Sequence, residues 1–408
     1  MNILVAISGT TIAQLLPILI TPLLTRLYSP TDFGIFSLYL GIVSICSVIV
    51  SARYELAIMQ SKSDKEAINV TSIAVFFTFL NSLLLLFLIY LLKGHILQWL
   101  GNHVAKHDWL YLIPICVGLT GLSQIFSYWY YRKKLFTKVA IAKTAQGIGL
   151  SLTQTGLNSH IFSFGLIWGH IIGALTSVMY LLYSLWGNHK SLLGSVSKNR
   201  LLKFLYKYKN YPMYSLWGAL LDAVAIQVPI FMLNKYYDSN TTGIFSLTFR
   251  TLNLPMTLIS TSISQVLFQK ISELNQTEQD SASKLIIKLF SILVGISIPL
   301  IFILFFWGEN LFSMVFGSEW EVAGKYASIL IFAVAIRFSV SPLSTVLALN
   351  HNLKIGFLWQ ATYFCTIICT LYSARGYNIE IFITIFVIHE LILYLLYLFL
   401  IIKGTKRC

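Results

Sequence analysis

Charged side chains are scarce in this 408-residue chain. They make up 11% of the residues, whereas hydrophobic residues make up 57% and the mean hydropathy is +0.76. A soluble domain carries roughly a quarter charged residues, so this chain has too few to cover a water-exposed surface. The scarcity excludes a cytosolic enzyme, a disordered chain and a secreted disulfide scaffold. It indicates a polytopic membrane protein, because each spanning helix needs about 20 mainly apolar residues.

Motifs for catalysis and metal binding are also missing from the sequence. None of the five cysteines forms a CxxC pair, and no G-x-S-x-G, P-loop or H-E-x-x-H run occurs. We therefore expect no enzyme activity, no metal site and no cofactor apart from a coupling cation. Without an ATP motif, transport would be driven by an ion gradient, the membrane potential or the substrate gradient.

Long apolar runs bounded by charges dominate what is present, and they predict about twelve membrane-spanning helices. The predicted fold class is therefore an all-α polytopic membrane protein. The expected limits of the spans are 3–24, 35–52, 67–92, 110–129, 139–157, 161–186, 212–233, 243–268, 285–307, 325–349, 355–374 and 381–402.

Basic residues are unevenly distributed between the two sides of these spans. Twenty-one of the 29 Lys and Arg residues fall in alternate connections or at the C-terminus, and only six fall on the opposite side. Since cytoplasmic loops are enriched in Lys and Arg, we expect both termini to be cytoplasmic. The net charge of +14 is then a signal of topology, and we expect no nucleic-acid partner.

A short internal repeat divides the chain into two halves. The pentapeptide GIFSL occurs at 34–38 and again at 243–247, and the same offset of 209 residues pairs Arg26 with Lys235 and Tyr28 with Tyr237. We interpret the repeat as two homologous six-helix lobes, residues 1–197 and 212–408, joined by a basic cytoplasmic linker at 198–211. Because an even number of spans separates the matching segments, the lobes have the same orientation in the membrane.

Ionisable side chains inside the apolar runs are the main candidate functional residues. A charge at mid-bilayer costs roughly 2.5–3.5 kcal/mol, so such a side chain usually faces a cavity or a charged partner. Asp222, Arg337 and Glu390 lie well inside their spans, and Arg250 lies nearer the outer end of the eighth. Two interpretations stay open for Arg250 and Arg337: they line a cavity, or they pair with Asp222, Glu390 or a backbone carbonyl.

Two further arginines end the first and second spans. Arg26 and Arg53 could line the same cavity, although anchoring at the membrane surface is the commoner role of such residues. Glu55 is the expected local partner of Arg53. His170 and His389 could relay protons or serve as hydrogen-bonded packing. A guanidinium group binds phosphate with two parallel hydrogen bonds and keeps its charge at any working pH. The four arginines are therefore the candidate substrate-binding residues.

Two segments near the start of the chain are GTTIAQLLPILITPLLTRLYSPTDFGIFSLYL at 9–40 and ARYELAIM at 52–59. They resemble the polysaccharide-exporter branch of the multidrug/oligosaccharidyl-lipid/polysaccharide flippase superfamily. Within it, the likeness is to O-antigen flippases of the Wzx type. The resemblance implies two six-helix lobes around a central cavity that opens alternately to each side. It implies that the protein flips undecaprenyl-pyrophosphate-linked oligosaccharides across the bacterial inner membrane. It also implies cationic cavity residues on the first, second and eighth spans, which Arg26, Arg53 and Arg250 match.

The resemblance also suggests how transport is driven. Some relatives carry a cation-binding acid on the seventh span, which Asp222 matches, but the expected partner acid is absent from 355–374. Sodium binding and protonation of Asp222 or Glu390 therefore both stay open. Membrane lipids, a polymerase and a chain-length regulator are the other candidate partners. The competing functions are a drug/cation antiporter of the same superfamily, expected to have an acidic cavity, and an O-antigen polymerase, expected to have a large outer loop containing arginine.

Overall fold

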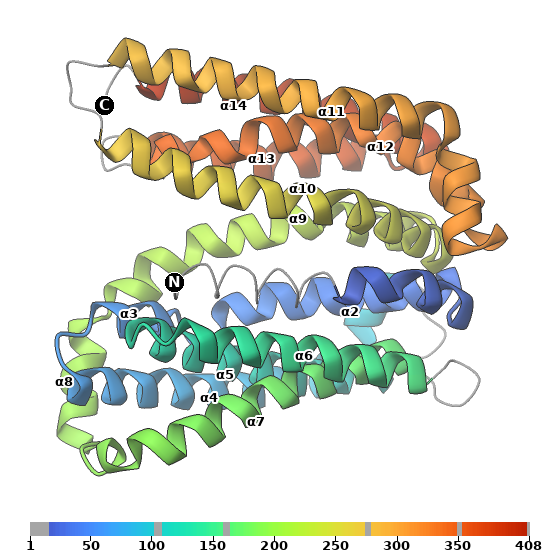
Figure 1. Cartoon of the computed structure of the whole chain (residues 1–408). Coiled ribbons are helices and arrows are strands. Elements are labelled where there is room, and N and C mark those ends of the chain that lie inside the picture. The colour runs from blue at the N-terminus through green and yellow to red at the C-terminus, as the bar shows by residue number, and fades with distance from the viewer. Residues whose placement is uncertain (1–15, 102–107, 158–163, 274–278, 349–352, 406–408) are drawn as a thin grey trace. The chain divides into compact units, whose positions relative to one another are not determined.

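The computed structural model describes residues 16–101, 108–157, 164–273, 279–348 and 353–405 (Figure 1). Within these ranges every regular element is helical, and eight helices are long and apolar enough to cross a membrane. The predicted all-α polytopic membrane fold is thereby confirmed. Residues 3–15 of the expected first span lie outside the described ranges, and the rest of that span is an apolar helix over Leu16–Leu27.

The first of two compact units comprises Met1–Gln227 and Asp238–Asn240. Its long helices coincide with the second to sixth expected spans, and α7 packs along α6. Small residues allow this contact, because a Cβ on Gly173 of α7 would lie 2.8 Å from the carbonyl oxygen of Gln146 on α6. The helices of this unit are α2 (Pro30–Ile49), α3 (Tyr54–Gln60), α4 (Asp64–Leu100), α5 (Ile113–Arg132), α6 (Phe136–Gly156), α7 (Gly165–Leu193) and α8 (Lys198–Lys207).

The second unit comprises Val228–Tyr237 and Thr241–Cys408. Its helices coincide with the expected spans of the second half, and α12 packs on both α11 and α14. The α-helical hydrogen bonding of α12 gives way to a 3₁₀ segment over Ser341–Ala348. The helices are α9 (Leu216–Tyr236), which begins in the first unit, α10 (Ser239–Glu273), α11 (Gln279–Phe316), α12 (Glu321–Val340), α13 (Leu353–Ala374) and α14 (Ile379–Thr405).

Helix boundaries follow the 209-residue repeat of the sequence. The helix that starts each GIFSL segment begins at Pro30 in α2 and at Ser239 in α10, 209 residues later. The preceding helices end at Leu27 and Tyr236, which differ by the same offset. These matching boundaries agree with a duplicated sequence, whereas the lobe limits at 197 and 212 stay a prediction.

Two short helices occupy segments where the sequence analysis expects loops. Helix α3 follows Ala52 and Arg53, whose φ angles of 52° and 63° lie in the left-handed region. Helix α8 lies within the predicted basic linker and carries exposed apolar and basic side chains. Its end is held to α4 by Glu66, which accepts hydrogen bonds from Lys207 Nζ and from the Tyr208 hydroxyl at 2.9 Å.

Candidate functional site

An ion pair inside the second unit joins two of the predicted site residues. Arg337 of α12 donates from Nε to Glu390 Oε2 of α14 and from Nη2 to the hydroxyl of Tyr363 on α13. The Tyr363 hydroxyl donates to Glu390 Oε1 at 2.7 Å, which closes a three-residue ring of hydrogen bonds. The Glu390 side chain is fully buried, whereas 17% of the Arg337 side chain remains exposed. The carboxylate is thus neutralised in place, and part of the guanidinium stays accessible.

Aromatic rings surround the Arg337 guanidinium. Its Cζ lies 5.5 Å from the ring centroid of Phe249, 5.6 Å from that of Tyr394 and 6.0 Å from that of Tyr363. Cation–π contacts of this kind are worth about 0.5–2 kcal/mol each, and most where water is excluded. They hold the guanidinium in place independently of Glu390.

His389 completes the surroundings of the acid. Its Nδ1 lies 3.6 Å from Glu390 Oε1, and its Nε2 lies 3.1 Å from the hydroxyl of Thr366 on α13. A histidine beside a buried carboxylate can exchange a proton with it. The geometry is compatible with both earlier interpretations of His389, proton relay and packing.

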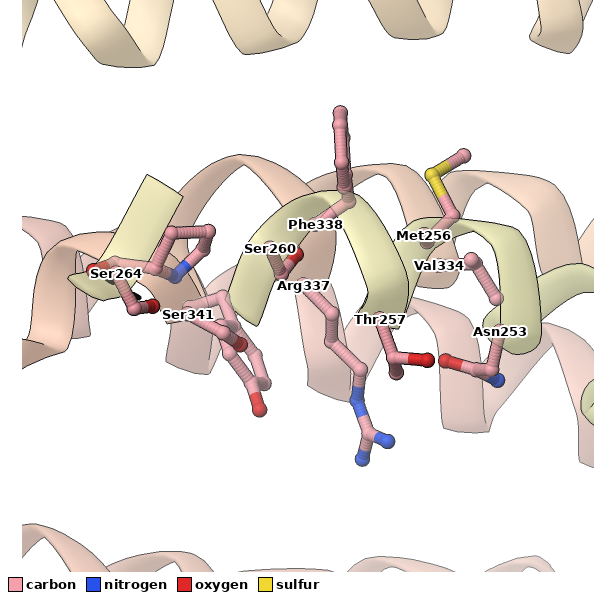
Figure 2. Close-up of a pocket in the computed structure, with 11 residues that line it drawn as sticks. Asn253, Met256, Thr257, Ser260, Ser264, Val334, Arg337, Phe338 and Ser341 are labelled. Carbon is pink, nitrogen blue, oxygen red and sulfur yellow. Dashed lines mark hydrogen bonds between the residues drawn. The ribbon is translucent and has the colours of Figure 1, made fainter. Parts of the chain in front are cut away.

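Arg337 also lines a pocket of about 320 Å³ between α10, α12 and α14 (Figure 2). Figure 2 shows the side chains of Arg337 and Phe338 pointing in opposite directions from α12, with Thr257 of α10 beside the arginine. The lining combines hydroxylic and apolar side chains, and consists of Asn253, Met256, Thr257, Ser260, Ser264, Val334, Arg337, Phe338, Ser341, Pro342 and Tyr394. Arg337 therefore combines the two alternatives left open by the sequence, since it is ion-paired and also lines a pocket.

A second pocket, of about 440 Å³, lies within the first unit. It is formed where the start of α3 meets α5, α6 and α7. Its lining is polar and aromatic: Arg53, Glu55, Thr120, Ser123, Gln124, Ser127, Tyr128, Tyr131, Lys143, Gln146 and Ala174. We call it the Arg53 pocket.

Arg53 itself is only weakly neutralised in this pocket. Its Nη1 lies 3.7 Å from Glu55 Oε1, so Glu55 is the local partner that the sequence predicts. Glu55 is buried and also accepts a hydrogen bond from Ser51. The Nε atom of Arg53 is buried and has no hydrogen-bond partner among the described residues.

The other predicted site residues are not part of these clusters. Arg26 is exposed at the end of the first helix, and Arg250 is exposed on α10. Neither forms an ion pair with any described residue. Asp222 is exposed on α9. Glu390 therefore pairs with Arg337, one of the predicted arginines.

Two residues of the clusters are missed by the sequence analysis. Lys143 is counted there as a topology signal, but it lies two helical turns into α6 and lines the Arg53 pocket. Tyr363 lies on the eleventh span, where an acid is expected and absent. Its hydroxyl contacts the acid of the twelfth span instead. Tyrosine is common in apolar runs, so the presence of Tyr363 in such a run does not by itself predict a contact with Glu390.

Metal binding offers no further candidate. Within the part of the chain that the structure describes, His, Cys, Asp and Glu side chains form no group of three or more that could hold a metal ion.

Solved structures that superpose on this chain include membrane transporters. An inward-facing multidrug resistance MATE family transporter of the MOP superfamily superposes with a TM-score of 0.74 at 11% identity, covering 97% of this chain and 96% of that chain. The lipid II flippase MurJ in an inward closed conformation gives a TM-score of 0.74 at 16% identity, covering 97% and 87%. A MOP superfamily transporter from Pyrococcus furiosus gives 0.64 at 11%, covering 99% and 96%.

These identities are low, so the superpositions show that the chain shares its fold with these transporters and show nothing finer. A search of curated protein sequences gave no match. A family model described as "Polysaccharide biosynthesis protein" matches residues 23–325, which is most of the chain. The match agrees with the resemblance carried by residues 9–40 and 52–59, and the chain belongs to this polysaccharide biosynthesis protein family.

Proposed function

We propose that this protein is a flippase that moves undecaprenyl-pyrophosphate-linked oligosaccharide repeat units across the bacterial inner membrane by alternating access. It would supply O-antigen or another surface polysaccharide, and it would be a transporter and not an enzyme. The observation that carries the proposal is the polysaccharide biosynthesis family match over residues 23–325 on a fold shared with a lipid II flippase.

The arginines explain how an anionic headgroup could cross. Pyrophosphate carries about two negative charges, and even one charge costs several kcal/mol in hydrocarbon. Exposed guanidinium groups on Arg26 and Arg250, and the weakly neutralised Arg53, can replace the lost hydration by charge-assisted hydrogen bonds. These three residues are the proposed ligands of the negative groups of the substrate, in agreement with the spans that the family resemblance predicts.

Arg337 and Glu390 are proposed to couple binding to ion movement. A substrate phosphate that approaches the exposed part of Arg337 competes with Glu390 for the same guanidinium. A released, buried carboxylate is unfavourable, so it would take up a proton or another cation. Glu390 is therefore a candidate coupling residue beside Asp222, and the coupling ion stays open between proton and sodium.

A drug/cation antiporter is the second candidate, because the MATE transporters share the fold. That function needs an acid that is free to bind a cation. Glu390 is occupied by Arg337 and Tyr363, and the pockets of both units are lined by arginine. The charges therefore favour an anionic substrate.

A polymerase and a chain-length regulator are proposed partners at the membrane.

The decisive experiment is transport by the purified chain in liposomes that contain a fluorescent undecaprenyl-pyrophosphate oligosaccharide. We expect the label to become accessible in the opposite leaflet, and Arg250→Ala to slow this at least about tenfold, since a charge-assisted hydrogen bond is worth about 1.5–3 kcal/mol. Arg250→Lys should retain part of the rate. Arg375→Ala, which removes an exposed arginine stacked on Tyr372, is the matched control. No transport by the wild-type chain, with transport of cationic dyes instead, would overturn the proposal.

A further inference from the structure

The Arg53 pocket contains more positive charge than its single acid can neutralise. Arg53 and Lys143 both line it, and Glu55 is the only acid in the lining. Lys143 is half-buried and forms no ion pair or hydrogen bond with any described residue. Arg53 keeps a buried Nε without a partner among those residues. An anion in the pocket would satisfy both groups.

The rest of the lining is suited to a polyhydroxylated ring. Gln124 and Gln146 present amide groups that make no hydrogen bonds to the described part of the chain. Tyr128 and Tyr131 contribute aromatic faces at right angles, with ring centroids 6.2 Å apart. Amides that hydrogen-bond hydroxyl groups, beside aromatic rings that pack on apolar ring faces, are a combination that fixes the orientation of a small polar ligand. The volume of about 440 Å³ lies within the usual ligand range of roughly 300–1,000 Å³.

The position of the pocket agrees with contact between the substrate and the protein before the substrate crosses the membrane. Arg53 follows the second span and Lys143 lies in the first half of the fifth, nearer the side where the basic residues predict the cytoplasm. A glycan assembled on the cytoplasmic leaflet would meet this side first. The remaining groups that face the pocket are hydroxyls and one alanine, so Arg53, Lys143 and Glu55 set its charge.

We propose that the Arg53 pocket is a binding subsite for an anionic sugar ring of the transported glycan, with Lys143 and Arg53 holding the negative group and Gln124 and Gln146 holding ring hydroxyls. The inference rests on the proposed function, since it says where one sugar of that substrate binds. The negative group can be the carboxylate of a hexuronic acid within the glycan. It can also be the phosphate on the sugar next to the lipid.

Binding of soluble sugars to the full chain in detergent tests the subsite directly. A ligand that binds only the folded state raises the unfolding temperature, so glucuronate, glucose 1-phosphate, glucose and inorganic phosphate can be compared on one scale. We expect glucuronate or glucose 1-phosphate to stabilise the wild-type chain more than glucose or phosphate alone. Stabilisation by glucuronate alone would identify an acidic sugar of the glycan, and stabilisation by glucose 1-phosphate alone would identify the lipid-proximal sugar.

Lys143→Gln should weaken this binding about tenfold, because it removes a charge-assisted hydrogen bond. The matched control is Lys138→Gln, which makes the same change on α6 at a lysine that lies over the Tyr180 ring and outside the pocket. Gln124→Ala, at an exposed side chain, gives a second variant if Lys143→Gln does not fold. Equal binding by wild type and both pocket variants, or equal stabilisation by phosphate and by the sugars, would overturn the subsite. Soluble-sugar binding does not depend on translocation, so its failure is distinguishable from failure of the liposome assay.

Discussion

Tyr28 and Tyr237, which are 209 residues apart, each donate a hydrogen bond to a backbone carbonyl near the end of the fifth span of their half. The Tyr28 hydroxyl donates to the carbonyl oxygen of Gln154 at 2.7 Å, in the last turn of α6, and to that of Leu157 directly after it. The Tyr237 hydroxyl donates to the carbonyl oxygen of Tyr377 at 2.8 Å, just after α13. Helices α6 and α13 are the fifth spans of their halves, so each tyrosine ties the turn after the first helix to the end of the fifth. This shared contact is structural support for the repeat that GIFSL indicates.

The two tyrosines should nevertheless differ in importance. Tyr28 is 3% exposed, and burial raises the pKa of its hydroxyl to about 12. Because loss of a buried hydrogen bond leaves an unsatisfied carbonyl, Tyr28→Phe should destabilise the protein by about 1–2 kcal/mol. Tyr237→Phe, at a more exposed bond, should cost about half as much or less. Thermal unfolding of both variants in the same detergent measures the difference, and a larger effect at Tyr237 would contradict the prediction.

Arg337 and Glu390 should stabilise the folded protein only when both are present. Removing one partner of a buried ion pair costs roughly 3–5 kcal/mol, because the other charge stays buried, whereas replacing both by apolar residues is often close to neutral. We therefore expect Glu390→Leu and Arg337→Met to lower the unfolding temperature strongly, and the double variant to recover most of the loss. Unfolding of the three variants measures this coupling.

The transport assay then separates structure from function at this pair. If Arg337 contacts the substrate, the double variant should be stable and transport slowly. Full transport by the double variant would assign Arg337 and Glu390 a purely structural role, and the coupling role proposed for Glu390 would fail with it.

Apolar runs of the sequence predict the spanning helices well, because each run is long enough to leave no alternative to a helix in the membrane. Charge alone does not reveal the partners of a residue. Arg337 and Glu390 are 53 residues apart on helices whose relative rotation and height follow from side-chain packing along α12 and α14. A partner that is close in the sequence is easier to predict, and Glu55, two residues from Arg53, is such a case.

Helix α3 and Lys143 show where the sequence is ambiguous. Seven residues are too few for a periodic pattern to distinguish a short helix from a loop, and α3 also begins after two residues in the left-handed region. Lys143 lies near a predicted helix end, where counting basic residues treats every lysine as a topology signal. Its role depends on which face of α6 turns toward α5, and this is set by packing in three dimensions.

Glu66 should hold α8 against α4. Its carboxylate accepts from Lys207 and Tyr208, and the hydrogen bond to Glu66 raises the pKa of Lys207. Glu66→Gln should therefore speed hydrogen exchange in α8 and leave that in α6 unchanged. The stabilisation from a raised lysine pKa is fully present below the unfolded value of about 10.4 and is lost as pH rises through the folded value, so protection of α8 should fall above about pH 10. It should fall in acid as well, where Glu66 is protonated and no longer pairs with Lys207. Unchanged exchange in α8 of the variant would mean that apolar packing holds the helix.

The orientation of the chain can be tested by chemical labelling of single cysteines in intact cells, in a background without the native cysteines. Cysteines at Ser29 and Glu319, both exposed, should react with an impermeant maleimide. Cysteines at Asn199 and Lys284 should react only after the membrane is permeabilised, since the basic residues place them in the cytoplasm. The reverse pattern at both pairs would invert the predicted topology and place the Arg53 pocket on the outer side.

The contact between α11 and α12 depends on two glycines. A Cβ on Gly324 of α12 would lie 2.5 Å from Cα of Glu309 on α11, and a Cβ on Gly308 would lie 2.8 Å from the carbonyl oxygen of Gly324. These neighbours are backbone atoms that cannot move aside, so Gly324→Ala should separate the helices and cost at least about 1–3 kcal/mol. Gly295→Ala on α11 is the matched control, because nothing lies within 4 Å of its added methyl group. That change should be neutral or stabilise by up to about 1 kcal/mol through helix propensity. Since α12 also carries Arg337, Gly324→Ala should slow transport as well as lower the unfolding temperature. If the variant keeps both the transport rate and the unfolding temperature of the wild type, α11 and α12 can slide to accommodate the methyl group.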